Sequence, residues 1–173
     1  KKRFRWLFNM IISILCVDNK YGIGKKNGLL FHLPLDMKHF KLETRGHMVF
    51  LGENTLLSFP GGKPLSNREH VVLSGDPTHN YEGVRNVHNI EEFLQILQDF
   101  GQKQDVYVIG GASVYRQTLP YVDKVLLTKV DADGEAEVFF PNLDLDPAFE
   151  CIDEGIPMQD GDYTIRFTTY VRR

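Results

Sequence analysis

Cysteine is scarce in this sequence, and its scarcity restricts the class of protein. The 173 residues include only two cysteines, Cys16 and Cys151. Two cysteines cannot form a framework of several disulfide bridges, and Cys16 lies in an apolar run, where a thiol usually acts as a small hydrophobic side chain. We therefore expect a protein of a reducing compartment, the cytoplasm.

An excess of charge of one sign is also missing. The sequence has 20 Lys and Arg against 23 Asp and Glu, which gives a formal net charge of -3. Apart from the first few residues, the basic side chains are spread along the chain, so no basic stripe predicts a nucleic-acid partner. A small anionic ligand is compatible with this distribution.

A signal-peptide cleavage site is the third absence. The N-terminus begins with basic residues and continues into an apolar run, which is the outline of a secretory signal. No small-x-small site follows, Asn9 interrupts the run, and Leu15 precedes Cys16 where a lipoprotein signal needs a small residue. We expect instead a strand that starts near Met10, with residues 1–9 as an N-terminal extension or a cloning remnant.

Internal repeats, low-complexity tracts and sustained heptads are absent as well. With 42% hydrophobic and 25% charged residues, the chain has the composition of one ordinary domain with a sizeable core. We expect residues 10–173 to form that single domain. No long apolar helix face demands a partner chain, so a monomer without membrane attachment is expected.

Short apolar runs bounded by turn residues predict buried strands. They lie at residues 10–17, 47–51, 70–74, 105–110 and 124–130. Because helical patterns separate several of these runs, right-handed crossovers and a largely parallel sheet are expected.

Two helices and a different C-terminal strand complete the prediction. The segment from Pro34 to Thr44 has proline at its first helical position, and Asn89 is the predicted N-cap of the apolar periodicity that follows it. Residues 163–171 alternate between apolar and polar side chains, which is typical of an antiparallel edge strand with one solvated face. The fold class is therefore α/β with a mixed sheet.

The run VYVIGGASVY places Gly110 and Gly111 between a predicted strand and a predicted helix. Ligands of open α/β sheets collect at this edge, and glycine lets the backbone approach a phosphate or an aromatic ring closely. A tight turn without a ligand explains the pair equally well, because the dinucleotide motif G-x-G-x-x-G is absent. A similar junction follows Gly52, where Asn54 or Thr55 would cap a short helix.

Asp36 is an acid among apolar neighbours. In the predicted first helix it occupies the first turn, where an acid complements the helix dipole. If Leu33, Met37 and Phe40 turn inward, the carboxylate turns inward with them and meets no Lys or Arg three or four residues on. A buried carboxylate needs a partner: a polar ligand, a hydroxyl, the nearby His32 or water. Such an acid is suited to hold a planar, amidine-like nitrogen pair by two charge-assisted hydrogen bonds.

Four motifs, in the same order, resemble those of the bacterial-type dihydrofolate reductase family. GIGKKNGLLFHLPLDMKHFK resembles the family's mobile loop and first helix, KPLSNREHVVLS a turn and strand, VYVIGGASVYRQTLP the Gly-Gly junction, and FFPNLD a segment near the C-terminal hairpin. The resemblance covers residues 10–172. It implies an eight-stranded, mostly parallel mixed sheet with four helices and an antiparallel C-terminal hairpin. It also implies reduction of 7,8-dihydrofolate to tetrahydrofolate for one-carbon and thymidylate metabolism, with NADPH as the hydride donor.

The resemblance also assigns roles to single residues. Asp36 matches the acid that hydrogen-bonds the pterin and promotes protonation of its N5 through water, and Thr128 matches the hydroxyl that orients this acid. Arg68 matches the guanidinium that binds the glutamate carboxylate, a task suited to its bidentate fork. Without the resemblance, Thr128 is an ordinary strand residue and Arg68 a solvated loop charge.

The resemblance implies a larger set of binding positions and no metal. The other substrate-binding positions are Ile14, Cys16, Met37, Phe40, Lys41, Phe59, Ile109 and Tyr115. The cofactor-binding positions are Cys16, Ile23, Gly24, Asn27, Gly52, Glu53, Asn54, Thr55, Leu73, Ser74, Ile109, Gly110, Gly111, Ala112, Ser113, Val114 and Tyr115. A cis peptide bond is implied between the two adjacent glycines, and glycines in the mobile loop are implied to let it close over the nicotinamide.

Several positions depart from the family pattern. Glu53 and Ser113 stand where the family usually has basic residues that receive the cofactor's phosphates, and Asp76 adds a further negative charge. One lost contact between a phosphate and a charged group costs about 1.5 to 3 kcal/mol, or roughly tenfold to more than a hundredfold in binding. A weakened preference for NADPH, with NADH as an alternative donor, is therefore expected. Phe31, a third catalytic position, replaces the usual Trp and lacks its indole N–H.

Two other functions also fit this sequence. A protein that binds folate or nucleotide with little turnover is suggested by Glu53, and a same-fold reductase would act on another pterin or a riboflavin precursor. Asp36 and Thr128 favour retained catalysis, and Arg68 favours folate as the substrate. Dihydrofolate and antifolate inhibitors are the expected small-molecule partners.

Overall fold

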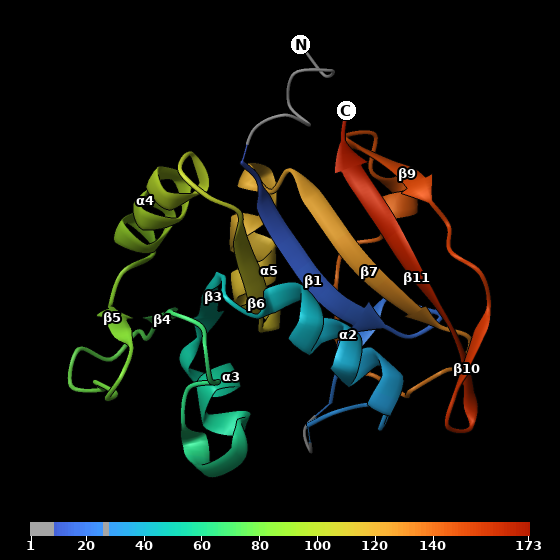
Figure 1. The fold of residues 1–173 in the computed structure, drawn as a ribbon, viewed down its shortest axis with the longest axis horizontal. Coiled ribbons are helices and arrows are strands. Elements are labelled where there is room, and N and C mark those ends of the chain that lie inside the picture. Colours follow the sequence, from blue (N-terminus) through green and yellow to red (C-terminus); the bar gives the residue numbers. More distant parts are fainter. Residues whose placement is uncertain (1–8, 26–27) are drawn as a thin grey trace. The chain divides into compact units, whose positions relative to one another are not determined.

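Residues 9–25 and 28–173 are described by the computed structural model, drawn as a ribbon in Figure 1. The chain divides into two units, and we call them the first unit (residues 1–12 and 44–122) and the second unit (residues 13–43 and 123–173). Strand β1 (Ile11–Val17) has its first two residues in the first unit and the rest in the second.

The first unit contains parallel strands. Its strand order is β6 (Val106–Gly110), β3 (Met48–Gly52), β4 (His70–Leu73) and β5 (Arg85–Val87). Each neighbouring pair is parallel, as the sequence predicted. Val49, Phe50 and Leu51 of the central strand β3 are fully buried, because both faces of a parallel sheet are covered.

Helices lie in the crossovers from β3 to β4 and from β5 to β6, whereas residues 74–84 connect the parallel strands β4 and β5 without a helix. The α-helices of this unit are α3 (Glu53–Ser58), α4 (Ile90–Gly101) and α5 (Ala112–Thr118). The short 3-10 helix η1 (Pro60–Gly62) follows α3, and η2 (Leu119–Tyr121) follows α5. In Figure 1, α5 lies against β6. The predicted start of α4 is confirmed: the side chain of Asn89 accepts a hydrogen bond from the Glu92 backbone N–H at 2.8 Å.

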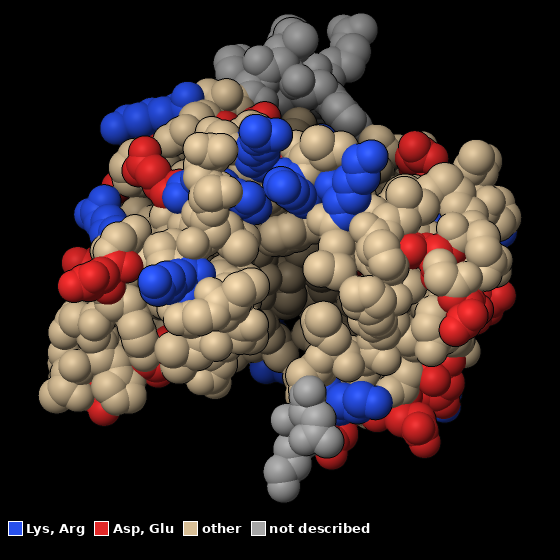
Figure 2. All heavy atoms as spheres, turned by 60° about the horizontal axis from the view of Figure 1, so that its bottom comes forward, with Lys and Arg blue, Asp and Glu red and all other residues tan. Residues whose placement is uncertain are grey.

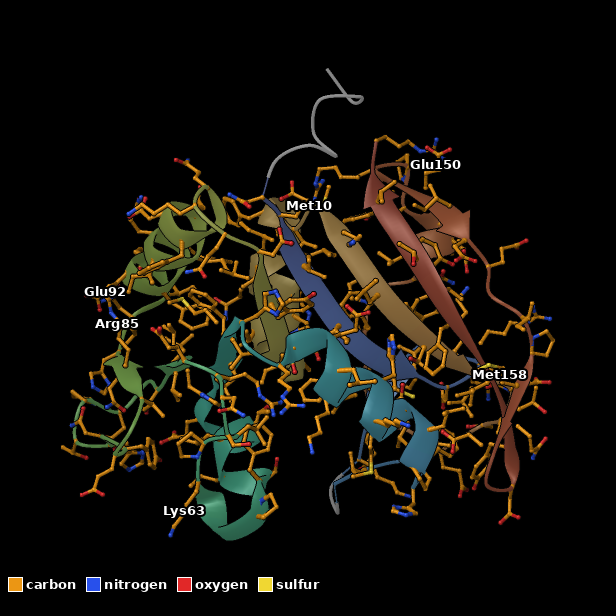
Figure 3. The ribbon with its side chains drawn as sticks, viewed as in Figure 1. Met10, Lys63, Arg85, Glu92, Glu150 and Met158 are labelled. Atoms are coloured by element: carbon orange, nitrogen blue, oxygen red, sulfur yellow. The ribbon has the colours of Figure 1, made fainter. Side chains whose placement is uncertain are left out.

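Helix α4 directs its apolar side toward the sheet. Phe93 and Leu97 are fully buried, and the Phe93 ring meets Phe50 edge to face, with ring centroids 5.6 Å apart. Glu92 is exposed and lies on the outer side of α4 in Figure 3. The amphipathic spacing of the sequence therefore identified the buried face correctly.

The second unit contains the antiparallel part of the sheet. Its strand order is β10 (Met158–Asp160), β11 (Tyr163–Arg172), β7 (Lys124–Val130) and β1. Strand β11 is antiparallel to both β7 and β10, which confirms the predicted C-terminal hairpin. Strand β9 (Phe149–Asp153) also pairs with β11, and Figure 1 shows the two side by side.

The expectation that residues 163–171 form an edge strand is wrong. Two short strands, β9 and β10, cover the side of β11 that β7 leaves open. The predicted solvated face is covered as well: Thr168 and Tyr170 are 4% and 1% exposed, and the Tyr170 hydroxyl donates to Asp144. Strands of three to five residues gave no clear periodic signal, so the sequence did not predict this cover.

The remaining elements of the second unit are short, except for one helix. Helix α2 (Pro34–Thr44) has the predicted bounds, although its last residue belongs to the first unit. Strand β2 (Gly22–Gly24) pairs with β8 (Val138–Phe139), and η3 (Leu143–Leu145) follows. The strand order contains eight strands, and a ninth strand, β9, pairs with β11. With the α-helices named above, these strands confirm the predicted fold class, α/β with a mixed sheet.

The surface charge is mixed. Basic and acidic side chains both occur on the face drawn in Figure 2, with uncharged surface between them. None of the helices within residues 9–25 and 28–173 has the length and apolarity needed to cross a lipid bilayer.

Gly155 is predicted to be essential for packing in the second unit. Its φ is +66°, and a Cβ atom there would lie 2.3 Å from the backbone oxygen of Phe167. We expect Gly155→Ala to lower the free energy of unfolding by about 2 kcal/mol or more, because neither backbone can move away cheaply. Urea denaturation measures the change, and Gly75→Ala is the control because nothing lies within 4 Å of its added Cβ. Equal losses in the two variants would contradict the prediction.

Candidate active site

The second unit holds the acid singled out by the sequence. Thr128 Oγ1 on β7 donates a hydrogen bond to Asp36 Oδ1 at 2.7 Å. Thr128 is 2% exposed, so its hydroxyl has a fixed direction, whereas Asp36 in the first turn of α2 is half-buried. Of the partners expected for this acid, the structure shows a hydroxyl, that of Thr128. His32, another expected partner, is exposed.

Burial controls the electrostatics of this group. It raises the pKa of the Asp36 carboxyl above its ordinary value, and the hydrogen bond from Thr128 is the largest opposing influence. Burial also raises the pKa of the Cys16 thiol, and the nearby Asp36 carboxylate adds to that rise. Cys16 is therefore a neutral thiol at physiological pH, next to an acid that gains a proton more readily than an exposed aspartate does.

Asp160 positions the turn that carries Asp36, and the sequence did not reveal it. Its Oδ1 accepts from the backbone N–H of Leu35 and its Oδ2 from that of Asp36, both at 3.0 Å. Asp160 lies on β10 and is 4% exposed, so it caps α2 from a strand more than 120 residues away. Caps are predicted from local spacing, and no local pattern reports such a distant one.

The apolar neighbours of Asp36 differ in part from the expectation. Leu33 is 4% exposed and packs with Val130 and Ile165, as expected. Phe40 is half-buried, but Met37 is 54% exposed, so the prediction that it turns inward is wrong. Leu33 precedes the first helical residue, and its direction therefore does not fix the helix face that Met37 occupies.

Phe31 and the residues around Asp18, where the predicted mobile loop begins, make close contacts within the second unit. The Phe31 ring meets Tyr163 edge to face, with centroids 4.7 Å apart. Asp18 is 2% exposed and accepts hydrogen bonds from the backbone N–H groups of Gly22 at 2.7 Å and Gly134 at 3.0 Å. A Cβ on Gly22 would lie 2.3 Å from that of Ala136, so this glycine allows close packing.

The first unit brings the two strand–glycine–helix junctions together. The Gly110–Gly111 peptide bond is cis, as the resemblance implied. Gly110 has a φ of +119°, and a Cβ on it would lie 3.2 Å from the Tyr115 ring. A Cβ on Gly52 would lie 3.3 Å from Val114 and 4.0 Å from the Gly110 carbonyl oxygen. Tyr115 and Val114 therefore leave little room for side chains at the carboxyl ends of β3 and β6, and we call the backbone at Gly52, Gly110 and Gly111 the glycine surface.

The predicted cap of α3 is wrong. Gly52 is the N-cap and makes no side-chain capping bond, because α3 begins at Glu53 directly after β3. Asn54 and Thr55 are consequently helical residues rather than caps. The Thr55 hydroxyl oxygen lies 3.4 Å from where a Cβ of Gly111 would be, so it lines the same glycine surface.

Glu53 is held by two side chains that the sequence did not identify. His79 Nδ1 lies 2.7 Å from Glu53 Oε2, and the Tyr81 hydroxyl donates to the same oxygen. The hydrogen bond from Tyr81, followed by that from His79, lowers the pKa of the Glu53 carboxyl, so it is anionic at neutral pH. The turn after β4 carries both partners, and a polar turn by itself gives no signal of this contact.

Arg68 and Phe59 also lie in the first unit. Arg68 donates from Nη1 to Thr44 Oγ1 at 3.1 Å and from Nε to the Ser66 carbonyl at 2.9 Å. Partial burial lowers the pKa of the guanidinium, with a smaller effect from Arg45. Phe59 is half-buried and meets the His70 ring edge to face.

The predicted positions divide between the units. The second unit contains Ile14, Cys16, Ile23, Gly24, Phe31, Asp36, Met37, Phe40, Lys41 and Thr128. The first unit contains Gly52, Glu53, Asn54, Thr55, Phe59, Arg68, Leu73, Ser74, Ile109, Gly110, Gly111, Ala112, Ser113, Val114 and Tyr115. Asn27 lies outside the described residues.

Parallel strands whose carboxyl ends carry glycine, followed directly by helices, are typical of α/β enzymes that bind nucleotides. Comparison with known proteins identifies the family within this class. The family model for dihydrofolate reductase matches residues 10–172. The chain belongs to the dihydrofolate reductase family.

Individual relatives support this membership. The chain is 30% identical over 168 residues to a dihydrofolate reductase of Staphylococcus haemolyticus, which covers 96% of this chain and 98% of that protein. It is 35% identical over 135 residues to one of Bacillus subtilis, covering 78% and 77%. Among solved structures, dihydrofolate reductase from Enterococcus faecalis complexed with NADP(H) and RAB-propyl is similar, with a TM-score of 0.81. That structure is 32% identical and covers 95% of this chain and 96% of that one.

The hydrogen bond from Thr128 is predicted to keep Asp36 ionised. In Thr128→Val the carboxylate loses a charge-assisted donor, so its pKa should rise further and the protein should lose about 1.5 to 3 kcal/mol of stability at pH 7. Because the protonated acid needs no such donor, the loss should shrink toward pH 3. Carbon NMR titration of the Asp36 carboxyl and urea denaturation measure the two effects. Thr168→Val is the control, since its buried hydroxyl donates to the Leu127 carbonyl instead; an equal pKa rise there would contradict the prediction.

Asp160 is predicted to stabilise the start of α2. Asp160→Ala leaves the backbone N–H groups of Leu35 and Asp36 without their acceptors, and we expect a loss of about 1 to 2 kcal/mol in the free energy of unfolding. The exposed Asp162, in the same turn between β10 and β11, is the control as Asp162→Ala. Thermal or urea unfolding measures the difference, and no difference between the variants would rule out the capping role.

Proposed function

We propose that this chain reduces 7,8-dihydrofolate to 5,6,7,8-tetrahydrofolate, with NADPH as the hydride donor. Family membership over residues 10–172 supports this reaction. The observation in the molecule that carries it is the Asp36 carboxylate, half-buried and oriented by the hydroxyl of Thr128 at 2.7 Å.

Asp36 has the chemistry needed to bind the pterin. A carboxylate with one oxygen fixed by Thr128 keeps acceptor sites for two adjacent N–H groups of a flat heterocycle. Because burial raises its pKa, the acid also takes up a proton more readily than a solvated aspartate. We assign to it the binding of the ring and, through water, the protonation of N5.

Each unit also supplies side chains for the substrate in this proposal. In the second unit, Phe31, Met37 and Phe40 offer apolar surface to the pterin and aminobenzoyl groups. In the first unit, Phe59 is assigned an apolar contact of the same kind. Arg68 binds the glutamate carboxylate: its hydrogen bonds to Thr44 and Ser66 use Nη1 and Nε, so Nη2 donors are left for a ligand.

The glycine surface of the first unit fits the nicotinamide cofactor. A Cβ on Gly110 would lie 3.2 Å from the Tyr115 ring, so the packing at the end of β6 requires a residue without a side chain. NADPH, when bound, supplies the hydride that reaches C6 of the pterin. The chain's part is to hold the cofactor at this edge, where strand ends and helix starts present free N–H groups.

We further propose that the protein works as a monomer in the cytoplasm, with dihydrofolate and antifolates as its small-molecule partners. Both cysteines are free thiols, which agrees with a reducing compartment.

The reaction is tested by dihydrofolate-dependent loss of NADPH absorbance. We expect Asp36→Asn to lower kcat by about a hundredfold or more, since proton transfer by a positioned acid contributes that much. The same variant should be more stable than the wild type at pH 7. The folded-state pKa of Asp36 is raised, so its contribution to stability is present below about pH 4 and is lost as the pH rises.

Asp162→Asn is the matched control, because Asp162 is exposed. If the wild type shows no dihydrofolate-dependent oxidation of NADPH or NADH, a binding-only protein or a reductase of another heterocycle is the better description. If Asp36→Asn keeps full activity while the wild type is active, the acid has been assigned wrongly and the reaction stands.

A further inference from the structure

We infer that Glu53 selects between the two nicotinamide dinucleotides: its carboxylate accepts a hydrogen bond from the ribose 2′-hydroxyl of NADH and repels the 2′-phosphate of NADPH. The chain then uses NADH at an efficiency close to that with NADPH. This inference rests on the proposed function, because it concerns the donor of the same hydride.

The position of Glu53 in the first unit is the first support. Glu53 follows the last residue of β3, and Gly52 pairs with Leu73, the last residue of the neighbouring parallel strand β4. Ligands of open α/β sheets bind beyond the carboxyl ends of such strands. In doubly wound dinucleotide-binding folds, an acid hydrogen-bonds the ribose 2′-hydroxyl of NAD, whereas an arginine accommodates the 2′-phosphate of NADP, and we apply the same chemistry to Glu53.

The orientation of the carboxylate is the second support. His79 and Tyr81 both bind Oε2, and the Ser74 side chain also hydrogen-bonds the carboxylate, so three side chains fix it. A carboxylate has about four acceptor sites, so it can accept one further hydrogen bond. The Glu53 side chain is 19% exposed, which leaves it reachable from solvent. The hydrogen bonds that lower its pKa also keep it charged across the neutral range.

The surrounding charges are the third support. Asp76 lies just beyond β4, with its Oδ2 3.3 Å from His79 Nε2. In the part of the chain that the structure describes, the ion pairs of Glu53 and Asp76 are both with His79. Arg85, labelled in Figure 3, is the first residue of the parallel strand β5 and therefore lies at the amino end, away from the carboxyl edge.

These charges act differently on the two cofactors. A 2′-phosphate carries close to two negative charges and would meet two carboxylates that His79 cannot fully neutralise. A ribose hydroxyl is neutral and can donate to a fixed carboxylate oxygen, a charge-assisted hydrogen bond. Replacing a favourable contact to the phosphate by repulsion changes the relative affinity by roughly tenfold or more.

Steady-state kinetics test the inference. We expect the ratio of kcat/KM for NADPH to that for NADH to be below about ten in the wild type, to rise at least threefold in Glu53→Gln, and to rise at least tenfold in Glu53→Arg. Glu92→Gln is the control, because this exposed acid in the first turn of α4 loses the same charge away from the strand ends. Smaller changes at Glu53, or equal changes at Glu92, would overturn the inference.

A binding measurement separates this inference from the proposed reaction. Adenosine 2′,5′-bisphosphate and adenosine 5′-monophosphate differ only by the 2′-phosphate, and calorimetry gives their affinities without turnover. The wild type should bind the two within about threefold, and Glu53→Arg should favour the bisphosphate by at least tenfold. A wild type that favours the bisphosphate more than tenfold would refute the inference even if dihydrofolate is reduced. The expected affinities in a protein that reduces no dihydrofolate would refute only the reaction.

Discussion

The hydrogen bond between Thr128 and Asp36 is the interaction on which the chemistry of the second unit depends. A carboxylate that leaves water costs free energy unless donors replace the lost solvation. Thr128 supplies one donor from a strand interior, and Asp160 fixes the backbone turn from which the acid projects. Burial outweighs the hydrogen bond from Thr128, and the negative charge of Asp160 acts in the same direction as burial, so the pKa of Asp36 is raised. The fold thus keeps the acid that we propose for proton transfer easier to protonate than a solvated aspartate, at the expense of stability.

The sequence predicted the parts of the fold that depend on local chemistry. Proline at the first helical position marked the start of α2, and Asn89 with the apolar spacing after it marked α4. Short apolar runs bounded by turn residues located the central strands to within one residue. The short strands β9 and β10 were missed because their existence depends on β11, a partner that no local pattern specifies. The error about an edge strand followed from that omission.

The site was predictable to the extent that its residues carry their own signal or match a family motif. Asp36 was found from its unpaired charge among apolar residues, and the motif added Thr128, which by itself resembles any strand threonine. Asp160, His79 and Tyr81 act only through partners that the fold brings to them. Met37 was misjudged because helical spacing was extended to a residue before the helix.

Two acids in this chain show how the surroundings set the function of one chemical group. Asp36 lies among apolar side chains and has a raised pKa, which suits binding a heterocycle and passing a proton. Glu53 lies at a strand end, where Tyr81 and His79 donate to it and lower its pKa. A permanent charge is of little use for proton transfer, but it discriminates between a phosphate and a hydroxyl. Burial and hydrogen bonding, rather than residue type, therefore separate the proposed catalytic acid from the proposed cofactor-selecting one.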